Sequence, residues 1–203
     1  GEANVGNYDE YTVLLDGMIN DWRSHWNDDF SFYFAQIAPF IYSTSEISQG
    51  LRDAQRKILN VTPKTGMAIL LDIGEENDIH PHNKQDVGKR LALLALNKDY
   101  GFDLVDSGPL YSNHYVKNEY IEISFDNLGS GLKAKQPLLG FEISVQDSIF
   151  YPAEAEIKND KLKVYSPEVI KPKDVRYGWK NYFEATLFNL EGLPASSFTT
   201  SDQ

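Results

Sequence analysis

A histidine framed by carboxylates is the feature of this sequence with the clearest chemistry. His80 lies in the segment Asp72–Pro81, and Asp78 stands two residues before it. An imidazole titrates near pH ~6.5, so it can take up and return a proton at neutral pH. The segment therefore predicts general acid–base chemistry, with His80 as the base.

The residues on either side of this segment predict the elements that position it. Gly66–Asp72 is a short apolar run that ends in a charge, which is typical of a buried strand. Asn83–Asp99 has apolar residues at helical spacing, and Asn83 is a suitable N-cap. His80 then lies on a loop at the carboxyl end of a strand, where open α/β sheets carry their sites.

Helices and strands alternate through the first half of the chain. We expect a helix from about Asp9 to Trp26, a strand over Phe30–Ile37, and a helix from Ser48, as a possible cap, to Leu59. This order predicts a parallel three-layer α/β/α arrangement. Only two strands are recognisable, and two parallel strands cannot form a stable sheet covered on both faces. We therefore expect further strands from elsewhere.

After Gly101 the pattern changes to short runs with alternating apolar residues. The predicted strands are Tyr120–Phe125, Gly140–Val145, Ala155–Ile157, Leu162–Tyr165 and Asp174–Tyr177. Asn159–Asp160 is a suitable hairpin turn between two of them. These features predict an antiparallel β-sandwich. The boundary lies near residues 102–108, which gives one region over residues 1–105 and a second over 106–203.

Composition excludes several classes of function. The chain has 203 residues, of which 41% are hydrophobic, so it can bury a core. A formal net charge of -11 argues against nucleic acid and anionic membranes as partners. The sequence has no cysteine, which excludes disulfides, thiol catalysis and cysteine-ligated zinc. No apolar run approaches the ~20 residues of a membrane helix, and no signal peptide is visible at Gly1.

The histidine segment also carries a family resemblance. Asp72-x-Gly74-x-x-x-Asp78-Ile79-His80-Pro81-x-x-Lys84-x-x-Val87-Gly88-x-Arg90-Leu91-Ala92-Leu93 resembles the carboxy-terminal histidine block of the sialate O-acetylesterases. These are serine esterases of the SGNH hydrolase superfamily. Gly1-Glu2-Ala3-Asn4 resembles a second block of that family. Further blocks follow in the family's order at Ser107–Tyr111, Ile123–Leu132, Gly140–Ile143, Val175–Trp179 and Leu187–Phe198. The resemblance therefore covers nearly the whole chain.

The resemblance implies a fold and a set of site residues. Residues 1–105 would be the carboxy-terminal part of an SGNH-type, flavodoxin-like three-layer domain, and residues 106–203 a β-sandwich accessory domain. His80 would be the general base, and the Asn4 amide would donate to the oxyanion. Three alternatives remain for the acid partner of His80: Asp78, Glu2, or no acid at all in a Ser–His dyad. The superfamily often has an aspartate three residues before the histidine, but Asn77 occupies that position here.

The family's nucleophile has no counterpart in this chain. It lies in a Gly-Gln-Ser-Asn block, and these 203 residues contain no Gly-x-Ser triplet. Ser130 and Lys133 match a Ser-x-x-Lys pattern in a glycine-rich turn, which we attribute to chance. The chain thus resembles the carboxy-terminal half of an esterase, whose partner would be the amino-terminal half carrying the serine.

The remaining expectations follow from the same resemblance. The substrate would be an O-acetylated sugar, sialic acid or a relative, and the setting secreted or periplasmic. We expect no cofactor and no metal, because His80 and His82 have no further histidine or cysteine nearby. The chain alone would be inactive. The alternative function is a non-catalytic carbohydrate-binding or interaction module derived from such an esterase, in which Tyr177 and Trp179 could stack a sugar or pack in the core.

Overall fold

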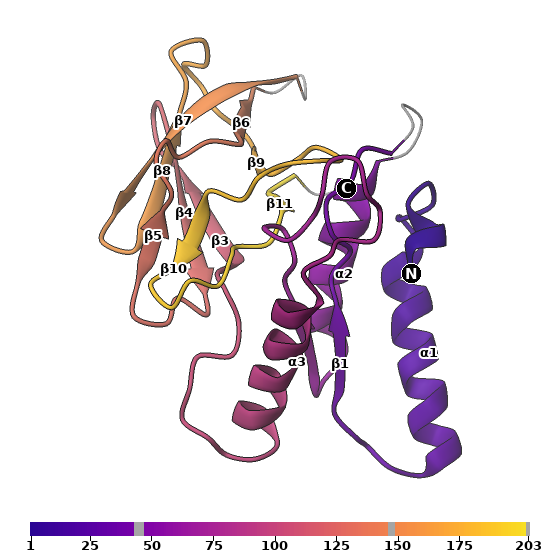
Figure 1. Cartoon of the computed structure of the whole chain (residues 1–203). Coiled ribbons are helices and arrows are strands. Elements are labelled where there is room, and N and C mark those ends of the chain that lie inside the picture. Colours follow the sequence, from indigo (N-terminus) through magenta and orange to yellow (C-terminus); the bar gives the residue numbers. More distant parts are fainter. Residues whose placement is uncertain (43–46, 146–148, 202–203) are drawn as a thin grey trace. The chain divides into compact units, whose positions relative to one another are not determined.

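The computed structural model describes residues 1–42, 47–145 and 149–201 (Figure 1). The chain divides into two compact units. Unit 1 comprises Gly1–Ser107 and Lys180–Tyr182, and unit 2 comprises Gly108–Trp179 and Phe183–Gln203. The sequence-based boundary was placed after residue 105. Among the described residues, no helix has both the length and the apolar character needed to span a bilayer.

Unit 1 alternates helices with two parallel strands. Its elements are η1 (Glu2–Asn4), α1 (Tyr11–Trp26), β1 (Phe32–Ala35), α2 (Ser48–Val61), β2 (Thr65–Ala68) and α3 (Lys84–Lys98). β1 pairs with β2 in parallel, in a register that runs from Phe32 opposite Thr65 to Ala35 opposite Ala68. The predicted helices are confirmed, and so is the parallel strand pair. The described strands β1 and β2 form a sheet of two strands. The three-layer core stays a prediction.

Both predicted strands are longer than the observed ones. The β2 ladder ends at Ala68, although the prediction ran to Asp72. The chain then turns, and the Ile73 N–H donates to the Leu70 carbonyl at 3.1 Å. Ile69, Leu70 and Leu71 nevertheless stay buried, so burial rather than strand pairing accounts for the apolar run.

The helices of unit 1 follow the apolar spacing of the sequence. α1 buries one stripe of residues four apart, formed by Tyr11, Leu15, Ile19 and Arg23. Its apolar members pack in one cluster with Leu51, Ala54 and Ile58 of α2. Arg23 closes the carboxyl end of α1, because its guanidinium donates to the carbonyl of Phe30 at 3.0 and 2.8 Å and to that of Pro63 at 3.0 Å.

One predicted cap is confirmed and the other is wrong. The Asn83 side chain accepts from the Asp86 N–H at 3.1 Å, as an N-cap does. Ser48 does not cap α2. It is the first helical residue, and Ile47 occupies the N-cap position without a side-chain cap. The Ser48 hydroxyl is used elsewhere, since it accepts from Arg52 at 3.0 Å and donates to the side chain of Asn181 at 3.1 Å.

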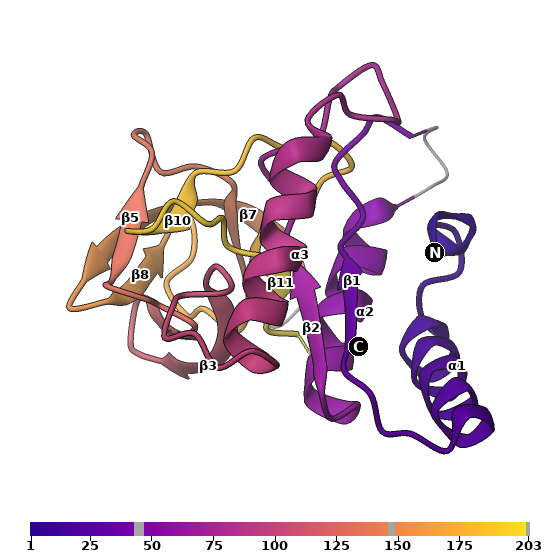
Figure 2. The same cartoon turned by 60° about the horizontal axis from the view of Figure 1, so that its bottom comes forward.

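Unit 2 is antiparallel throughout its described strands. The strands are β3 (Leu110–Val116), β4 (Ile121–Asp126), β5 (Leu132–Ala134), β6 (Phe141–Ser144), β7 (Phe150–Lys158), β8 (Lys161–Tyr165), β9 (Val175–Tyr177), β10 (Leu187–Asn189) and β11 (Phe198–Thr199). Seven form one strongly curved sheet in the order β11-β9-β6-β7-β8-β4-β3, and β5 pairs with β10 (Figures 1 and 2). The predicted antiparallel character is confirmed. β3, β5, β10 and β11 were not predicted.

The core of unit 2 comes from strand alternation and from a group of aromatic rings. Ile121 and Ile123 of β4 are fully buried. Tyr177 is also fully buried, with its ring 4.6 Å from that of Phe141, and its hydroxyl accepts backbone N–H groups of Thr186 and Leu187 at 3.0 Å. Tyr177 is therefore a core residue and cannot be a sugar-stacking platform.

The predicted hairpin turn between β7 and β8 is confirmed. Asn159 and Asp160 both have positive φ, at 52° and 55°. Two adjacent residues in this region form the tight turn that matches the twist of an antiparallel pair. The Asp160 carboxylate also accepts the Leu132 N–H at 3.1 Å, which ties the turn to β5.

Candidate active site

The predicted site residues of unit 1 lie on segments near the carboxyl edge of its two strands. The loop after β1 contacts the loop after β2, because the Ile41 N–H donates to the Glu76 carbonyl at 3.3 Å. The short helix η1 joins the loop after β1, since the Tyr42 hydroxyl donates to the Glu2 carboxylate at 2.9 Å. Figures 1 and 2 show η1 and both loops at the same end of unit 1.

Gly74 allows the two loops to approach each other. A Cβ atom at this position would lie 2.2 Å from the Pro39 carbonyl oxygen and 2.7 Å from the Pro39 nitrogen. Real side chains do not make contacts this short, and backbone atoms cannot move aside easily. The glycine of the histidine segment is therefore needed for loop packing.

A partly buried ion pair anchors the start of the histidine loop to α3. The Arg90 guanidinium binds both carboxylate oxygens of Asp72, at 2.6 and 2.7 Å, and also donates to the Ile69 carbonyl at 2.6 Å. Arg90 is only 7% exposed. A two-pronged Arg–carboxylate pair fixes direction as well as distance, so it sets the point at which the loop leaves β2. Asp72 and Arg90 have a structural role here.

His80 reaches solvent, and Asp78 does not orient its ring. The Asp78 carboxylate accepts the backbone N–H of His80 at 2.8 Å. Among the described residues, no side chain is hydrogen-bonded to the His80 imidazole. The exposed ring is free to meet a group that arrives from outside this chain. Asp78 shapes the turn that presents the ring.

Glu2 and Asn4 both lie on η1, away from any hydrogen bond with His80. Glu2 is exposed and is held by the Tyr42 hydroxyl. Asn4 is half-buried, and its side-chain oxygen accepts from the Gly1 nitrogen at 3.0 Å. That bond uses the side-chain oxygen of Asn4 and not its amide N–H₂ group. The structure thus places the predicted site residues on two segments and does not bring their reactive groups into contact.

The sequence did not predict that His82 pairs with Glu75. The His82 Nδ1 atom lies 3.0 Å from both carboxylate oxygens of Glu75, and the His82 backbone N–H donates to Glu75 at 2.7 Å. The side-chain hydrogen bond raises the pKa of His82 above its ordinary value, and the Glu75 charge adds to this effect. The same hydrogen bonds, from the backbone and the ring of His82, lower the pKa of Glu75.

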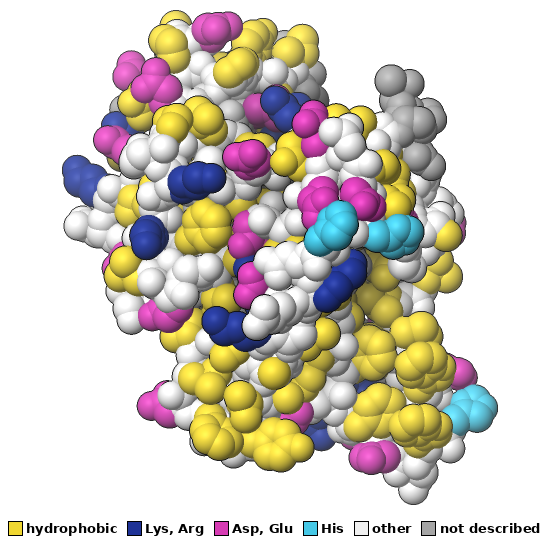
Figure 3. Space-filling model, viewed as in Figure 1, with side chains coloured by type: hydrophobic (Ala, Val, Ile, Leu, Met, Phe, Trp, Pro, Cys, Tyr) yellow, Lys and Arg dark blue, Asp and Glu magenta, His cyan; other side chains and the backbone are white. Residues whose placement is uncertain are grey.

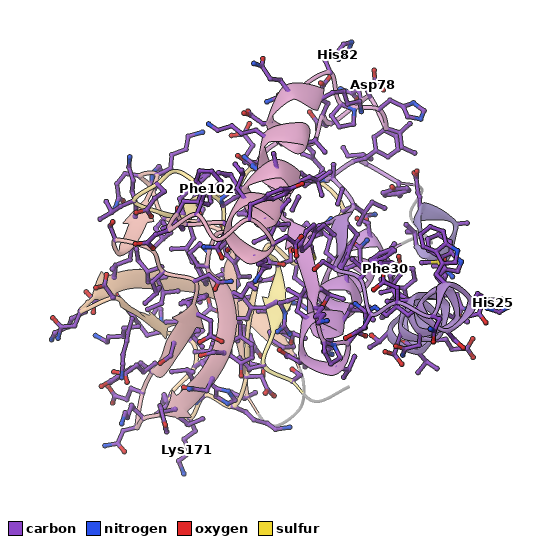
Figure 4. The ribbon with its side chains drawn as sticks, turned by 90° about the horizontal axis from the view of Figure 1, so that it is seen from below. His25, Phe30, Asp78, His82, Phe102 and Lys171 are labelled. Atoms are coloured by element: carbon purple, nitrogen blue, oxygen red, sulfur yellow. The ribbon has the colours of Figure 1, made fainter. Side chains whose placement is uncertain are left out.

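Asp78 completes a small cluster with this pair. Ligand atoms of Glu75, Asp78 and His82 all lie within 4.8 Å of one another in the described part of the chain. Figure 4 shows Asp78 and His82 beside each other near the beginning of α3. Figure 3 shows exposed histidines next to carboxylates on the same face of unit 1. Carboxylate and imidazole groups can ligate a divalent cation, but here hydrogen bonds within the loop account for their positions.

Arg52 connects the segment Lys180–Tyr182 to the rest of unit 1. It is fully buried, and its guanidinium donates to the carbonyls of Lys180 and Asn181, the latter at 3.3 Å. Burial lowers the pKa of Arg52 to about 9, so the group remains protonated at neutral pH. Asn181 also accepts the Phe40 N–H through its carbonyl at 3.2 Å, which secures the loop after β1.

The sequence held no local signal for either of these features. Glu75 and His82 are seven residues apart and meet only because the loop folds back between them. Arg52 and Lys180 are 128 residues apart.

Comparisons with known proteins complete the description of the site. No protein-family model matches the chain, and no curated protein does. Among solved structures, the chain is similar to the crystal structure of a carbohydrate acetylesterase from Xanthomonas citri, with a TM-score of 0.93 and 36% sequence identity. The match covers 100% of this chain and 49% of that one, so the chain spans about half the length of the structure it matches.

Proposed function

We propose that this chain is the histidine-bearing part of a carbohydrate acetylesterase that removes O-acetyl groups from sialic acid or a related sugar. The observation that carries the proposal is the 36% identity and TM-score of 0.93 to a carbohydrate acetylesterase over the whole chain. An exposed His80 on a firmly anchored loop supports it. The serine nucleophile belongs to a segment that corresponds to the unmatched half of that enzyme.

The proposed reaction is an acyl transfer in two steps. The serine hydroxyl attacks the acetyl carbonyl while the His80 imidazole takes up its proton, and the Asn4 amide donates to the oxyanion that forms. His80 then gives the proton to the sugar oxygen as the C–O bond breaks. In the second step His80 takes a proton from water, whose oxygen attacks the carbonyl carbon of the acetyl-serine. His80 then gives this proton to the serine oxygen as its bond to the acyl carbon breaks, which releases acetate and restores the free serine.

Two carboxylates remain candidates for the acid that stabilises the imidazolium. In our proposal Asp78 is a positioning residue, because it already binds the His80 backbone N–H. Glu2 is the second candidate, which would contact the His80 ring from η1 when the serine-bearing segment is bound. In this structure its carboxylate accepts the Tyr42 hydroxyl. If neither carboxylate reaches the ring, His80 and the serine act as a dyad.

The test is esterase activity after reassembly. The chain is mixed or co-expressed with a polypeptide covering the unmatched half of the Xanthomonas citri enzyme, and hydrolysis of an aryl acetate is followed. We expect His80→Ala to lower kcat/KM by at least about 1000-fold with an unchanged melting temperature. The control is His82→Ala, which removes an exposed imidazole from the same loop and should retain most of the activity. Near wild-type activity of His80→Ala would refute the assignment.

The choice of sugar and the location are further parts of the proposal. A panel of O-acetylated sialic acids and acetylated xylo-oligosaccharides, assayed by acetate release, separates sialate specificity from a plant-glycan preference. A secreted or periplasmic location rests on the sequence resemblance, and cell fractionation tests it.

The alternative function is a binding module without catalysis. Unit 2 has a pocket of about 320 Å³ lined by Glu119, Glu154, Tyr165, Ser166, Pro167, Val169 and Ile170. Carboxylates beside a tyrosine and apolar side chains suit a sugar, whose hydroxyls donate and whose ring faces are apolar. Binding of an acetylated sugar by calorimetry, with no hydrolysis in any reassembled mixture, would favour this alternative.

A further inference from the structure

Strand β1 has an open edge. β1 pairs with β2 on one side, and none of the other described strands pairs with it. The backbone N–H groups of Phe32 and Gln36 donate to carbonyls of the neighbouring β2 segment at 2.9 Å. Because successive residues of a strand point to opposite sides, the backbone groups of Tyr33 and Ala35 point away from β2. Within the described ranges of the chain, these backbone groups form a short row of donors and acceptors without a hydrogen-bond partner.

Burial of the two strands is unequal. Met67 and Ala68 of β2 are each 2% exposed, whereas no residue of β1 is buried and Ala35 is exposed. Parallel strands in α/β proteins are normally covered on both faces and paired on both sides except at the sheet margin. Natural proteins protect a margin strand with charge, proline or a covering loop. Phe32–Ala35 contains only aromatic residues and alanine.

Helix α1 extends past the sheet on the side of this open edge. α2 packs on β2, α3 packs on both strands, and α1 packs on α2. Next to its buried stripe, α1 carries a second apolar stripe that faces outward. Its members Leu14, Trp22 and Trp26 are 51%, 47% and 72% exposed. A helix that covers a sheet has this wide apolar face when a strand lies beneath it.

Aromatic contacts join the outward stripe of α1 to β1. The Trp22 ring lies 6.0 Å from that of Phe32, and the Trp26 ring lies 5.3 Å from that of Phe30. Figure 3 shows hydrophobic side chains gathered over α1 and β1, and Figure 4 labels Phe30 in this region. We call Leu14, Trp22, Trp26, Phe30, Phe32 and Ala35 the β1-edge surface. It combines the open edge of a strand with exposed apolar side chains.

We propose that a polypeptide segment docks on the β1-edge surface through a strand that pairs in parallel with β1 beneath α1. This segment is the counterpart of the half of the Xanthomonas citri acetylesterase that the present chain does not match. This inference rests on the proposed function, because the occupant is the polypeptide that carries the nucleophile. The comparison leaves about half of the acetylesterase without a counterpart in this chain, and a further parallel strand is the element that this edge lacks. The occupant can belong to the same polypeptide or to another.

Parallel pairing has a direct consequence for the candidate site. Strands that run in the same direction end at the same edge of the sheet, so the residues after the docked strand lie at the edge that carries the loops after β1 and β2. Those loops hold Tyr42 and His80. Docking would therefore deliver the nucleophile-bearing half to the side of unit 1 where His80 is exposed.

Hydrogen exchange tests the location. The 203-residue chain is measured alone and with a polypeptide covering the unmatched half of the Xanthomonas citri acetylesterase. The amides of Tyr33 and Ala35 should exchange fast in the chain alone and slow at least about 10-fold in the mixture. The Phe32 amide already bonds to the β2 segment and serves as the internal reference. No slowing at Tyr33 and Ala35, or slowing confined to other segments, overturns the inference.

Two matched substitutions test the apolar part of the surface. Trp26→Ser should weaken binding of the same polypeptide at least about 10-fold in a titration. Tyr100→Ser is the control, because Tyr100 is 73% exposed, close to the 72% of Trp26, lies just after the end of α3, and should leave binding unchanged. Equal binding by Trp26→Ser and wild type would overturn the inference. Circular dichroism confirms that both variants are folded.

A second copy of the chain is the competing occupant. A two-fold dimer would pair β1 with β1 in the antiparallel sense. Sedimentation that shows a dimer of the chain alone, abolished by Trp26→Ser, would overturn the proposal in favour of self-association. The activity assay is separate: protection at β1 without hydrolysis refutes the esterase function alone, and hydrolysis without protection refutes the docking site alone.

Discussion

The imidazole of His80 reaches solvent, whereas that of His82, two residues later, is held by Glu75. The two rings therefore differ in what they can do. A base must be able to receive a proton from a substrate or nucleophile, and Glu75 already binds the Nδ1 atom of His82 and raises the pKa of that ring. At the scale of single residues, the His80 ring has no such partner among the described side chains, and its proposed role as the base rests on the family resemblance of its segment.

The Glu75–His82 pair gives a prediction for pH dependence. The pKa of His82 is raised, so its contribution to loop stability is full below the ordinary histidine pKa and is lost as pH rises through the raised value. The pKa of Glu75 is lowered, so its contribution is present above its ordinary value and is lost as pH falls through the lowered one. The ion pair exists between these two limits.

Proton NMR titration of the histidine rings checks this expectation. The His82 signal should titrate above the ordinary pKa of 6.5, and Glu75→Gln should move it down towards that value. Both side chains are exposed, so the melting temperature should change little. An unchanged His82 titration in Glu75→Gln would mean that the pair does not form in solution.

At the scale of elements, the order of helices and strands in unit 1 follows from sequence periodicity alone. Helices α1, α2 and α3 were predicted from apolar residues three and four apart. The cap at Asn83 was predicted from its residue type, since an asparagine side chain can accept a backbone N–H. Four strands of unit 2, β3, β5, β10 and β11, do not follow from the sequence in this way. β5, β10 and β11 have two or three residues each, and β3 carries polar residues, so no period can be read from them.

The packing of the loops could not be predicted from the sequence either. The approach of Gly74 to Pro39 depends on how two distant segments fold, and the sequence shows only a glycine between an isoleucine and a glutamate. The candidate residues His80, Asp78, Glu2 and Asn4 could be named from their surroundings and from the family resemblance. Their mutual distances could not, because they depend on tertiary packing.

Gly74→Ala provides a stability test of the loop packing. The added methyl would meet the Pro39 backbone, so we expect the free energy of unfolding to fall by about 1–3 kcal/mol. Gly88→Ala is the matched control. Gly88 lies in α3 with no atom within 4 Å of an added Cβ, so alanine there should stabilise by about 0.5–1 kcal/mol. Urea unfolding of both variants measures the difference, and equal effects would contradict the packing argument.

At the scale of the whole molecule, the units are not consecutive stretches of chain. The chain leaves unit 1 after Ser107, returns to it for Lys180–Tyr182, and re-enters unit 2 at Phe183. The returning segment supplies carbonyl acceptors for Arg52, and Asn181 binds Ser48 at the beginning of α2. Unit 1 is therefore complete only when residues from the second half of the sequence are present.

Arg52→Met tests the strength of this connection. Loss of the buried guanidinium removes the donor to the Lys180 carbonyl and one of the donors to the Asn181 carbonyl, and we expect a loss of about 3 kcal/mol or more in the free energy of unfolding. Arg52→Lys should restore only part of it, because one ammonium cannot serve several acceptors as a guanidinium fork does. Lys57→Met, at a half-exposed ion pair with Asp53, should cost less than about 1 kcal/mol. Similar losses at both positions would argue against a special role of Arg52.

The return of Lys180–Tyr182 also bears on how such a protein can be rearranged at the level of its gene. A coding segment that stopped at residue 107 would yield unit 1 with Arg52 facing no acceptor from this segment. The coding sequences of the two units therefore cannot be exchanged independently between related genes. Recombination between relatives should keep both halves of the coding sequence together.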